Sequence, residues 1–121
     1  MTTEHNEQAA LVGWFRVAYP EYASLLFAVP NGAHLAGASG ARARQMATLK
    51  AEGLTPGVSD LVLLVARGIY HGAVIEIKKP GGVLSPEQVA FLALAASQCY
   101  YDIVAWTFEE AQAMLQDYME Q

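Results

Sequence analysis

Residues 57–88 read GVSDLVLLVARGIYHGAVIEIKKPGGVLSPEQ, and they decide the fold because they hold two short apolar segments separated by a break. Leu61–Val65 and Ala73–Lys78 are rich in Val, Ile and Leu, a composition typical of buried strands. Gly68 lies in the break between them. The pattern predicts a hairpin of two neighbouring strands, with Gly72 as a candidate bulge.

Three charged side chains interrupt this apolar hairpin. Asp60 precedes the first strand, while Glu76 and Lys78 lie on the second. Because side chains on a strand alternate between faces, Glu76 and Lys78 share a face and lie about 7 Å apart. In a simple hairpin register Asp60 lies at the same end, so the three side chains converge at one edge. Unpaired buried charges are costly, so something must compensate for them.

A divalent cation is one such partner. Two carboxylates repel each other by roughly 4 kcal/mol at about 4 Å and an effective dielectric of about 20. Carboxylate oxygens are the ligands that Mg²⁺ and Mn²⁺ prefer, and a nearby lysine is suited to hold a water or a phosphate oxygen. These are the parts for metal-assisted phosphodiester hydrolysis. The spacing alone leaves open that Glu76 and Lys78 form an exposed pair on a solvated face.

Length and composition predict one packed domain. The chain has 121 residues, of which 54% are hydrophobic and 16% charged. No apolar run approaches the ~18 residues of a membrane span, and no signal-peptide pattern opens the chain. A single cysteine, Cys99, excludes an internal disulfide, and its apolar surroundings predict a buried thiol. We therefore expect an intracellular domain over residues 1–121 without a membrane segment.

Charge is distributed unevenly along the chain. The formal net charge of -5 argues against nucleic acid as a partner. However, all seven Lys and Arg residues precede Gly81, whereas six acidic residues and no basic ones follow it. Positive charge is thus concentrated in the part that holds the hairpin, which is compatible with a local surface for phosphates.

Helix and strand signals alternate along the chain. Pro20 and Gly53 are stop signals, and Ser85-Pro86-Glu87-Gln88 and Thr107-Phe108-Glu109-Glu110 each resemble a capping box. The expected elements are helix Glu4–Tyr19, strand Leu25–Val29, helix Ser39–Glu52, strands Leu61–Val65 and Ala73–Lys78, a helix from Pro86 to about Gln98, strand Tyr101–Trp106 and a helix after Thr107. This order, αβαββαβα, predicts an α/β fold with a mixed sheet flanked by helices.

Two blocks carry a family resemblance. KAEGLTPGVSDLVL at Lys50–Leu63 and GAVIEIKKPGGVLSPEQ at Gly72–Gln88 resemble the VRR-NUC nucleases, the virus-type replication-repair branch of the PD-(D/E)xK superfamily. The resemblance extends to FAVPNG at Phe27–Gly32 and YYDIVAW at Tyr100–Trp106, and so covers nearly the whole chain. It implies a restriction-endonuclease-like core and a DNA endonuclease that depends on Mg²⁺ or Mn²⁺.

The resemblance also implies roles for individual residues. Asp60 and Glu76 match the two carboxylate metal ligands of the family, and Ile77 matches the position whose backbone carbonyl is a further ligand. Lys78 matches the lysine that positions or activates the hydrolytic water. Gln88 matches a glutamine that reaches toward the same site.

Two positions near this motif need comment. The proline of the family's P-D dipeptide is Ser59 here, which removes rigidity but no metal ligand. The family also places a glutamate in its first helix. Glu4 is our assignment because it precedes Gln8 by four residues and shares a helical face with it, and Glu7 is the alternate. An ordinary acid in a first turn, stabilised by the helix macrodipole, is the structural alternative for either.

Candidate DNA contacts lie mainly in and around the second predicted helix. They are Lys50, Arg42 and Arg44 in that helix, Asn31 in the loop before it, and Lys79 after the hairpin. A solvated helix face is the alternative for Arg42 and Arg44. His34 and His71 do not lie in a metal-ligand spacing, and we do not expect either to bind a metal.

Stand-alone proteins of this family act as homodimers on branched DNA, including four-way junctions, and the resemblance implies the same here. A catalytically silent DNA-binding or dimerisation module on the same fold is the main alternative. A metal-dependent hydrolase of free nucleotides is a third interpretation.

Overall fold

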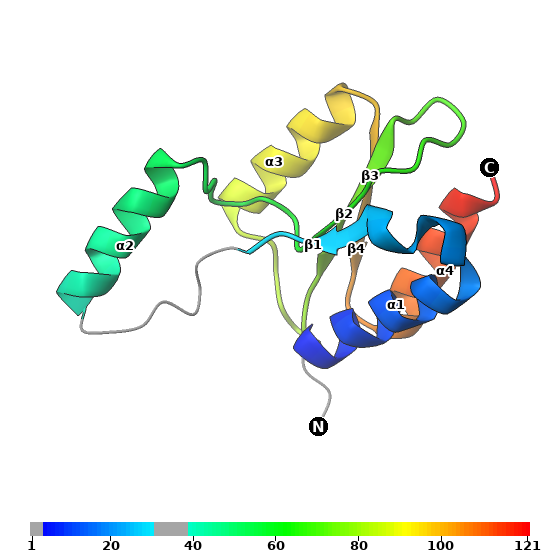
Figure 1. The fold of residues 1–121 in the computed structure, drawn as a ribbon, viewed down its shortest axis with the longest axis horizontal. Coiled ribbons are helices and arrows are strands. Elements are labelled where there is room, and N and C mark those ends of the chain that lie inside the picture. The colour runs from blue at the N-terminus through cyan, green and yellow to red at the C-terminus, as the bar shows by residue number, and fades with distance from the viewer. Residues whose placement is uncertain (1–3, 31–38) are drawn as a thin grey trace.

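A four-stranded mixed sheet forms the centre of the protein, with helices on both faces (Figure 1). The computed structural model describes residues 4–30 and 39–121. The strands are β1 (Leu26–Ala28), β2 (Leu61–Leu63), β3 (Gly72–Ile77) and β4 (Tyr100–Ala105), in the spatial order β1-β2-β3-β4. The first two pairings are antiparallel and the β3–β4 pairing is parallel, as expected when a helix joins two neighbouring strands.

The helices form two layers. Helix α3 (Pro86–Ser97) connects β3 to β4 and lies on one face of the sheet, while α1 (Glu4–Ala18) and α4 (Phe108–Met119) lie together on the other (Figure 1). Helix α2 (Ser39–Ala51) stands apart from the sheet. The predicted element order is confirmed, with bounds that differ by a few residues and one unpredicted 3-10 helix at Pro20–Leu25. In the part of the chain that the structure describes, none of the helices combines the length and apolar character needed to cross a bilayer.

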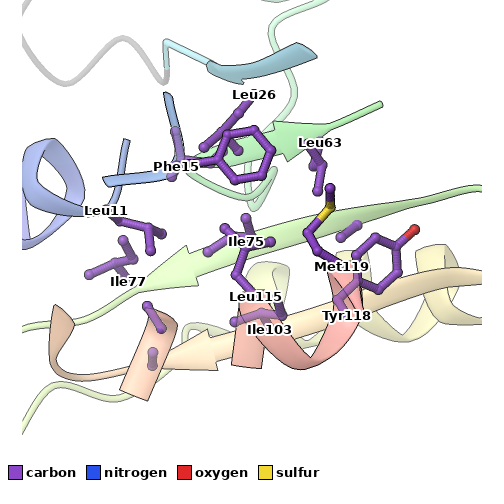
Figure 2. Close-up of a cluster of buried hydrophobic side chains, with 14 of the residues drawn as sticks. Leu11, Phe15, Leu26, Leu63, Ile75, Ile77, Ile103, Leu115, Tyr118 and Met119 are labelled. Atoms are coloured by element: carbon purple, nitrogen blue, oxygen red, sulfur yellow. The ribbon is translucent and has the colours of Figure 1, made fainter. Parts of the chain in front are cut away.

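Strand β3 is buried along its whole length and divides its side chains between the two faces. Ala73, Ile75 and Ile77 belong to the main core, which α1 and α4 cover, while Val74 faces α3. Figure 2 shows Ile75 and Ile77 among buried side chains of the neighbouring elements, Leu11, Phe15, Leu63, Ile103 and Leu115. The alternation predicted from the sequence therefore places Glu76 on the α3 side.

One of the two predicted capping boxes is complete in the structure, and the other is only half formed. At the start of α3, Ser85 and Gln88 form the complete reciprocal pair. At the start of α4, Thr107 accepts a hydrogen bond from the backbone N–H of Glu110 at 3.1 Å, but the Glu110 carboxylate contacts the Thr107 hydroxyl. The Phe108 N–H, another backbone donor of the first turn, donates to Glu7 on α1. A side chain 101 residues away therefore caps the start of α4 together with Thr107.

Two local expectations are wrong. Cys99 is exposed, not buried, because it follows the C-cap Gln98 in a surface turn with a left-handed φ of 65° that ends α3. Gly72 does not mark a bulge, because it pairs regularly with Tyr100. A Cβ atom at Gly72 would lie 2.5 Å from the Leu63 carbonyl oxygen, so glycine is needed there for a close approach of two strands.

Tyr118 joins the end of α4 to the end of the β2 segment. Its side chain is fully buried and its hydroxyl donates to the Val65 carbonyl at 2.6 Å. The ring also stacks on Tyr101, with 5.3 Å between centroids. The hydroxyl thus satisfies a buried carbonyl just after the hairpin strand that follows Asp60.

We predict that Tyr118→Phe lowers the free energy of unfolding by about 1–2 kcal/mol, because it leaves the buried Val65 carbonyl without its donor. Urea unfolding followed by circular dichroism measures the change. Tyr22→Phe is the matched control, since that ring is half-buried and its cation–π contact with Arg67 survives the loss of the hydroxyl. Equal stability of Tyr118→Phe and wild type would show that the hydrogen bond from Tyr118 to the Val65 carbonyl does not stabilise the fold.

Candidate active site

Asp60 and Glu76 face each other at one end of the β2–β3 pair. The register pairs Leu61 with Ile75, so the next position outward sets Asp60 opposite Glu76. Directly opposed residues on one face of a sheet have Cβ atoms about 5 Å apart. Asp60 is held by the backbone N–H of Ile77, which donates to Oδ2 at 2.9 Å. The structure thus brings together the two carboxylates that the hairpin pattern predicts.

Glu76 is almost completely buried, with 2% of its surface exposed. Its Oε1 accepts a hydrogen bond from Gln88 Nε2 at 2.8 Å and lies 4.0 Å from Lys78 Nζ. Its Oε2 is also buried and has no hydrogen-bond partner among the described residues. A buried carboxylate oxygen without a partner is costly, so this atom indicates a missing ligand.

The capping box of α3 aims Gln88 at Glu76. The Ser85 N–H donates to Gln88 Oε1 at 2.8 Å, and the Gln88 N–H donates to Ser85 Oγ at 3.1 Å. The amide oxygen is therefore fixed by the cap, which leaves the amide nitrogen pointing toward Glu76. A helix-start signal that is readable in the sequence thus also sets the geometry of the site.

Lys78 lies at the mouth of this cluster. It follows Ile77 at the end of β3, and its backbone N–H continues the parallel pairing by donating to the Ala105 carbonyl at 2.9 Å. Its side chain keeps 15% of its surface exposed, against 3% for that of Glu76. The Lys78 side chain is therefore nearer to solvent than the buried Glu76 carboxylate.

Glu4, and not Glu7, lies near the two carboxylates. Glu4 Oε1 accepts a hydrogen bond from the Lys79 backbone N–H at 3.2 Å, which ties the start of α1 to the end of β3. Its negative charge also contributes to the raised pKa of both Asp60 and Glu76. Glu7 caps α4 instead, as described above. The geometry therefore supports the assignment of Glu4 as the first-helix acid.

The two carboxyl groups have perturbed proton affinities. Burial raises the pKa of Glu76 from 4.5 to about 7, and the negative charge of Asp60 adds to the rise while Lys78 opposes it. Burial also raises the pKa of Asp60 above 3.8, although the Ile77 N–H partly offsets the effect. This pair therefore resists full ionisation unless positive charge is added to it.

The donor set fits a hard divalent cation. Within residues 4–30 and 39–121, no three His, Cys, Asp or Glu side chains form a complete metal-binding group. Mg²⁺ needs only one or two protein carboxylates, because waters and substrate phosphates complete its shell. Asp60 and Glu76, with the partnerless Oε2, match that requirement. A bound cation would supply both the charge and the missing partner.

The remaining sequence-predicted residues lie elsewhere. Arg42, Arg44 and Lys50 are exposed on α2, so the structure does not place them beside the Asp60–Glu76 pair. Lys79 is exposed next to Lys78. His71 lies at the opposite end of β3 against Tyr100, with 5.8 Å between ring centroids. Asn31 and His34 lie outside the described residues.

Gly57 lies beside the site, although the sequence analysis gives it no role. Its φ of +89° is in the left-handed region, and a Cβ atom there would lie 2.4 Å from the Glu87 carbonyl oxygen. The turn that leads into Asp60 therefore rests on the first turn of α3, which carries Gln88. The sequence signal for this contact is the position of Gly57, three residues before Asp60.

Comparison with known proteins agrees with this architecture. The sequence profile of the VRR-NUC domain family matches residues 3–105. The chain belongs to the VRR-NUC domain family. A solved structure described as a VRR_NUC domain protein has a TM-score of 0.81 and 24% sequence identity to it, and the match covers 98% of this chain and 89% of that chain. No curated protein matches the chain.

The VRR-NUC match and the shared fold confirm two sequence-based expectations. The mixed sheet flanked by helices is the restriction-endonuclease-like α/β fold. The family is a nuclease family, so a nuclease-type, DNA-directed role is the coarse functional assignment for this chain.

Ser59 is where this VRR-NUC chain departs from the expected P-D dipeptide. Ser59 is fully buried, and its hydroxyl has no hydrogen-bond partner in the described part of the chain. A buried hydroxyl without a partner destabilises the fold by about 1–3 kcal/mol. The substitution therefore carries a stability cost beside the candidate metal ligand Asp60.

We predict that Glu76→Gln makes the metal-free VRR-NUC domain more stable than wild type above pH 7. The folded-state pKa of about 7 exceeds the ordinary 4.5, so the wild type loses stability as pH rises from about 4.5 to 7. The loss is at most about 3 kcal/mol, and glutamine abolishes it. Thermal unfolding with a chelator, between pH 4.5 and 8, measures the difference. If the stability difference between Glu76→Gln and wild type does not grow with pH, the ionisation of Glu76 does not destabilise the fold and the prediction is wrong.

We also predict that Gly57→Ala weakens Mn²⁺ binding while Gly53→Ala does not. Both glycines have positive φ, so both variants incur similar backbone strain of about 1–3 kcal/mol. Only the Gly57 Cβ meets the backbone of Glu87, whereas nothing lies within 4 Å of a Cβ at Gly53. Calorimetric Mn²⁺ titration, together with unfolding temperatures, separates the two effects. Equal Mn²⁺ affinity in the two variants would show that the contact does not position the site.

Proposed function

We propose that this VRR-NUC chain is a single-domain DNA endonuclease over residues 1–121 that depends on Mg²⁺ or Mn²⁺ and acts inside a cell. The observation that supports it most is the pair formed by the half-buried Asp60 and the buried Glu76, with one Glu76 oxygen left without a partner among the described residues. A structural carboxylate pair is normally neutralised by a Lys or Arg side chain. Here Lys78 lies 4.0 Å from the other Glu76 oxygen, so Oε2 lacks such a partner.

Each residue of the cluster has a distinct task in this proposal. Asp60 and Glu76 would hold the cation, with the backbone carbonyl of Ile77 as a further oxygen ligand. Gln88 orients Glu76 by donating to Oε1. Glu4 adds negative charge at the site and fixes the end of β3 through the Lys79 N–H. A divalent ion, when bound, supplies the positive charge that stabilises a phosphate under attack.

Lys78 would act directly on the reaction. Its Nζ lies 4.0 Å from the buried Glu76 carboxylate on a side chain that is partly exposed, and there it would orient the attacking water or stabilise negative charge on the phosphate oxygens. Because Glu76 keeps the ammonium near its own carboxylate, Lys78 is held in place before substrate binds. Such preorganisation is the usual source of catalysis by fixed charges.

Substrate binding would rely on local cations, since the chain carries a net charge of -5. Lys79 follows the catalytic lysine directly, and Arg42, Arg44 and Lys50 give α2 a basic character. Asn31 is a further candidate that lies outside the described residues. Contacts of this kind bind phosphates without reading sequence, so affinity should fall steeply with salt.

Branched DNA, including four-way junctions, is the substrate class that we propose, with a homodimer as the active form. A two-fold dimer presents two equivalent active sites at a fixed separation, and this suits symmetric nicking of a junction. A catalytically silent DNA-binding or dimerisation module is the alternative function. The complete set of Asp60, Glu76 and Lys78 at one end of the sheet favours the enzyme.

We predict that the purified protein nicks DNA in the presence of Mn²⁺ and that Lys78→Ala slows cleavage by about a hundredfold or more. Labelled duplex, flap and four-way-junction DNA of equal length form the substrate panel, and the junction should be cut fastest. Arg16→Ala is the control because it removes an exposed cation at the far end of α1 from Glu4.

Other outcomes of this assay identify the alternatives. If wild type binds DNA in a salt-dependent manner but never nicks it across a Mn²⁺ titration, the chain is a silent module. Turnover of free nucleotides without cleavage of DNA would indicate the nucleotide hydrolase. Equal rates for Lys78→Ala and wild type would place the activity at another site or in a contaminant.

A further inference from the structure

The sheet face that carries α3 is only partly covered. An apolar groove of about 380 Å³ lies between α3 and strands β2 to β4. Its lining includes Val62, Leu64, Val74, Phe91, Leu94 and Tyr100. Leu64 and Leu94 expose 54% and 68% of their surfaces. A contiguous apolar surface of this kind is typical of a docking site.

Helix α2 is the second uncovered feature. Every residue from Gly40 to Ala51 is exposed or only half-buried. Residues at helical spacing form one face that borders a hollow of about 510 Å³, namely Ala41, Arg44, Gln45, Thr48 and Leu49. A 13-residue helix is only marginally stable in water without tertiary packing. In Figure 1, α2 lies apart from both α3 and the sheet.

We propose that α2 of one copy of the chain docks in the groove beside α3 of a second copy, and that the second copy returns the same contact. Among residues 4–30 and 39–121 of one copy, α2 has no extensive contact with another helix or strand and the groove stays open, whereas a two-fold exchange covers both features in both copies. The inference builds on the dimer in the proposed function and names the surface that forms it. It does not depend on nuclease activity.

Charge favours this occupant of the groove. Helix α2 carries Arg42, Arg44 and Lys50 and contains no acidic residue. Two acidic residues lie close to lining residues of the groove: Glu87 is one turn before Phe91 on α3, and the exposed Asp102 pairs in register with Val74. No Lys or Arg follows Gly81 in the sequence. The basic helix of one copy and these acidic residues of another are therefore complementary in charge.

The helical spacing places one of the three cations of α2, Lys50, away from the docking face. Ala41, Thr48 and Leu49 lie on the face that borders the hollow, together with Arg44. Lys50 lies close to the opposite side, because nine residues of an α-helix turn through two and a half turns. Docking would therefore leave Lys50 on the outer side of the dimer.

The first experiment measures molar mass by light scattering after gel filtration, without DNA or metal. Wild type should elute with twice the chain mass of 13.0 kDa. Leu49→Glu on α2 and Leu94→Glu in the groove should each weaken the dimer by about tenfold or more, because each places a charge in the apolar contact. Val17→Glu is the matched control, since Val17 is 82% exposed on α1 outside both features. Far-UV circular dichroism verifies that all three variants are folded.

Mixing the two disruptive variants tests the pairing itself. Leu49→Glu copies keep an intact groove and Leu94→Glu copies keep an intact helix, so an equimolar mixture retains one of the two wild-type contacts. The mixture should form more dimer than either variant alone. A direct contact between two α3 helices would respond to Leu94→Glu but not to Leu49→Glu, and that result would overturn the proposal.

A disulfide distinguishes docking between copies from docking within one chain. Leu49→Cys and Leu94→Cys, combined in a Cys99→Ser background, should give a covalent dimer on mild oxidation. An internal disulfide in a monomer would show that α2 folds back onto its own groove and would overturn the exchange. A monomeric wild type would overturn both this inference and the proposed dimer. The nicking assay would still test the proposed nuclease activity independently. A dimer unaffected by either glutamate variant would overturn this inference alone.

Discussion

The whole arrangement depends on two carboxylates that oppose each other at the end of a buried strand pair. The β2–β3 register leaves Asp60 and Glu76 no other placement, because a slip of one residue would turn Ile75 and Ile77 out of the core. Each fully buried aliphatic side chain of β3 contributes about 1.5–3 kcal/mol. The apolar alternation therefore holds the acids in a position that their own electrostatics disfavours. The proposed cation would convert this unfavourable pair into a binding site.

Backbone contacts around the pair keep its geometry fixed. The Ile77 N–H holds Asp60, and the capping box at the start of α3 holds the amide of Gln88 against Glu76. The turn at Gly57 rests on that same first turn of α3, so Asp60 and Gln88 are positioned by one shared contact. Few of these restraints depend on long flexible side chains. A small domain can therefore hold its candidate metal ligands in order without a large surrounding scaffold.

Sequence predicts the parts of this structure whose causes are local. The hairpin, the Ser85 cap and the face shared by Glu76 and Lys78 follow from strand alternation and helix-start chemistry. Long-range contacts lie beyond that reasoning: the cap of α4 by Glu7 joins residues 101 positions apart, and nothing near Thr107 indicates it. Cys99 has apolar neighbours in the sequence, yet the end of α3 forces it into an exposed left-handed turn. The separation of α2 from the sheet also has no local signal, because its composition is that of an ordinary surface helix.

The position of α2 connects the electrostatics of the chain to its assembly. In one copy, the cations of α2 stand away from the carboxylate pair, so a monomer keeps this part of its candidate phosphate-binding charge apart from its candidate catalytic residues. The groove beside α3 runs along the helix whose first turn carries Gln88, next to Glu76. An α2 helix seated there by a second copy would place basic residues on the sheet face of its partner that also carries Glu76. Dimer formation would then move the positive charge of this acidic chain, whose net charge is -5, from an isolated helix to that face.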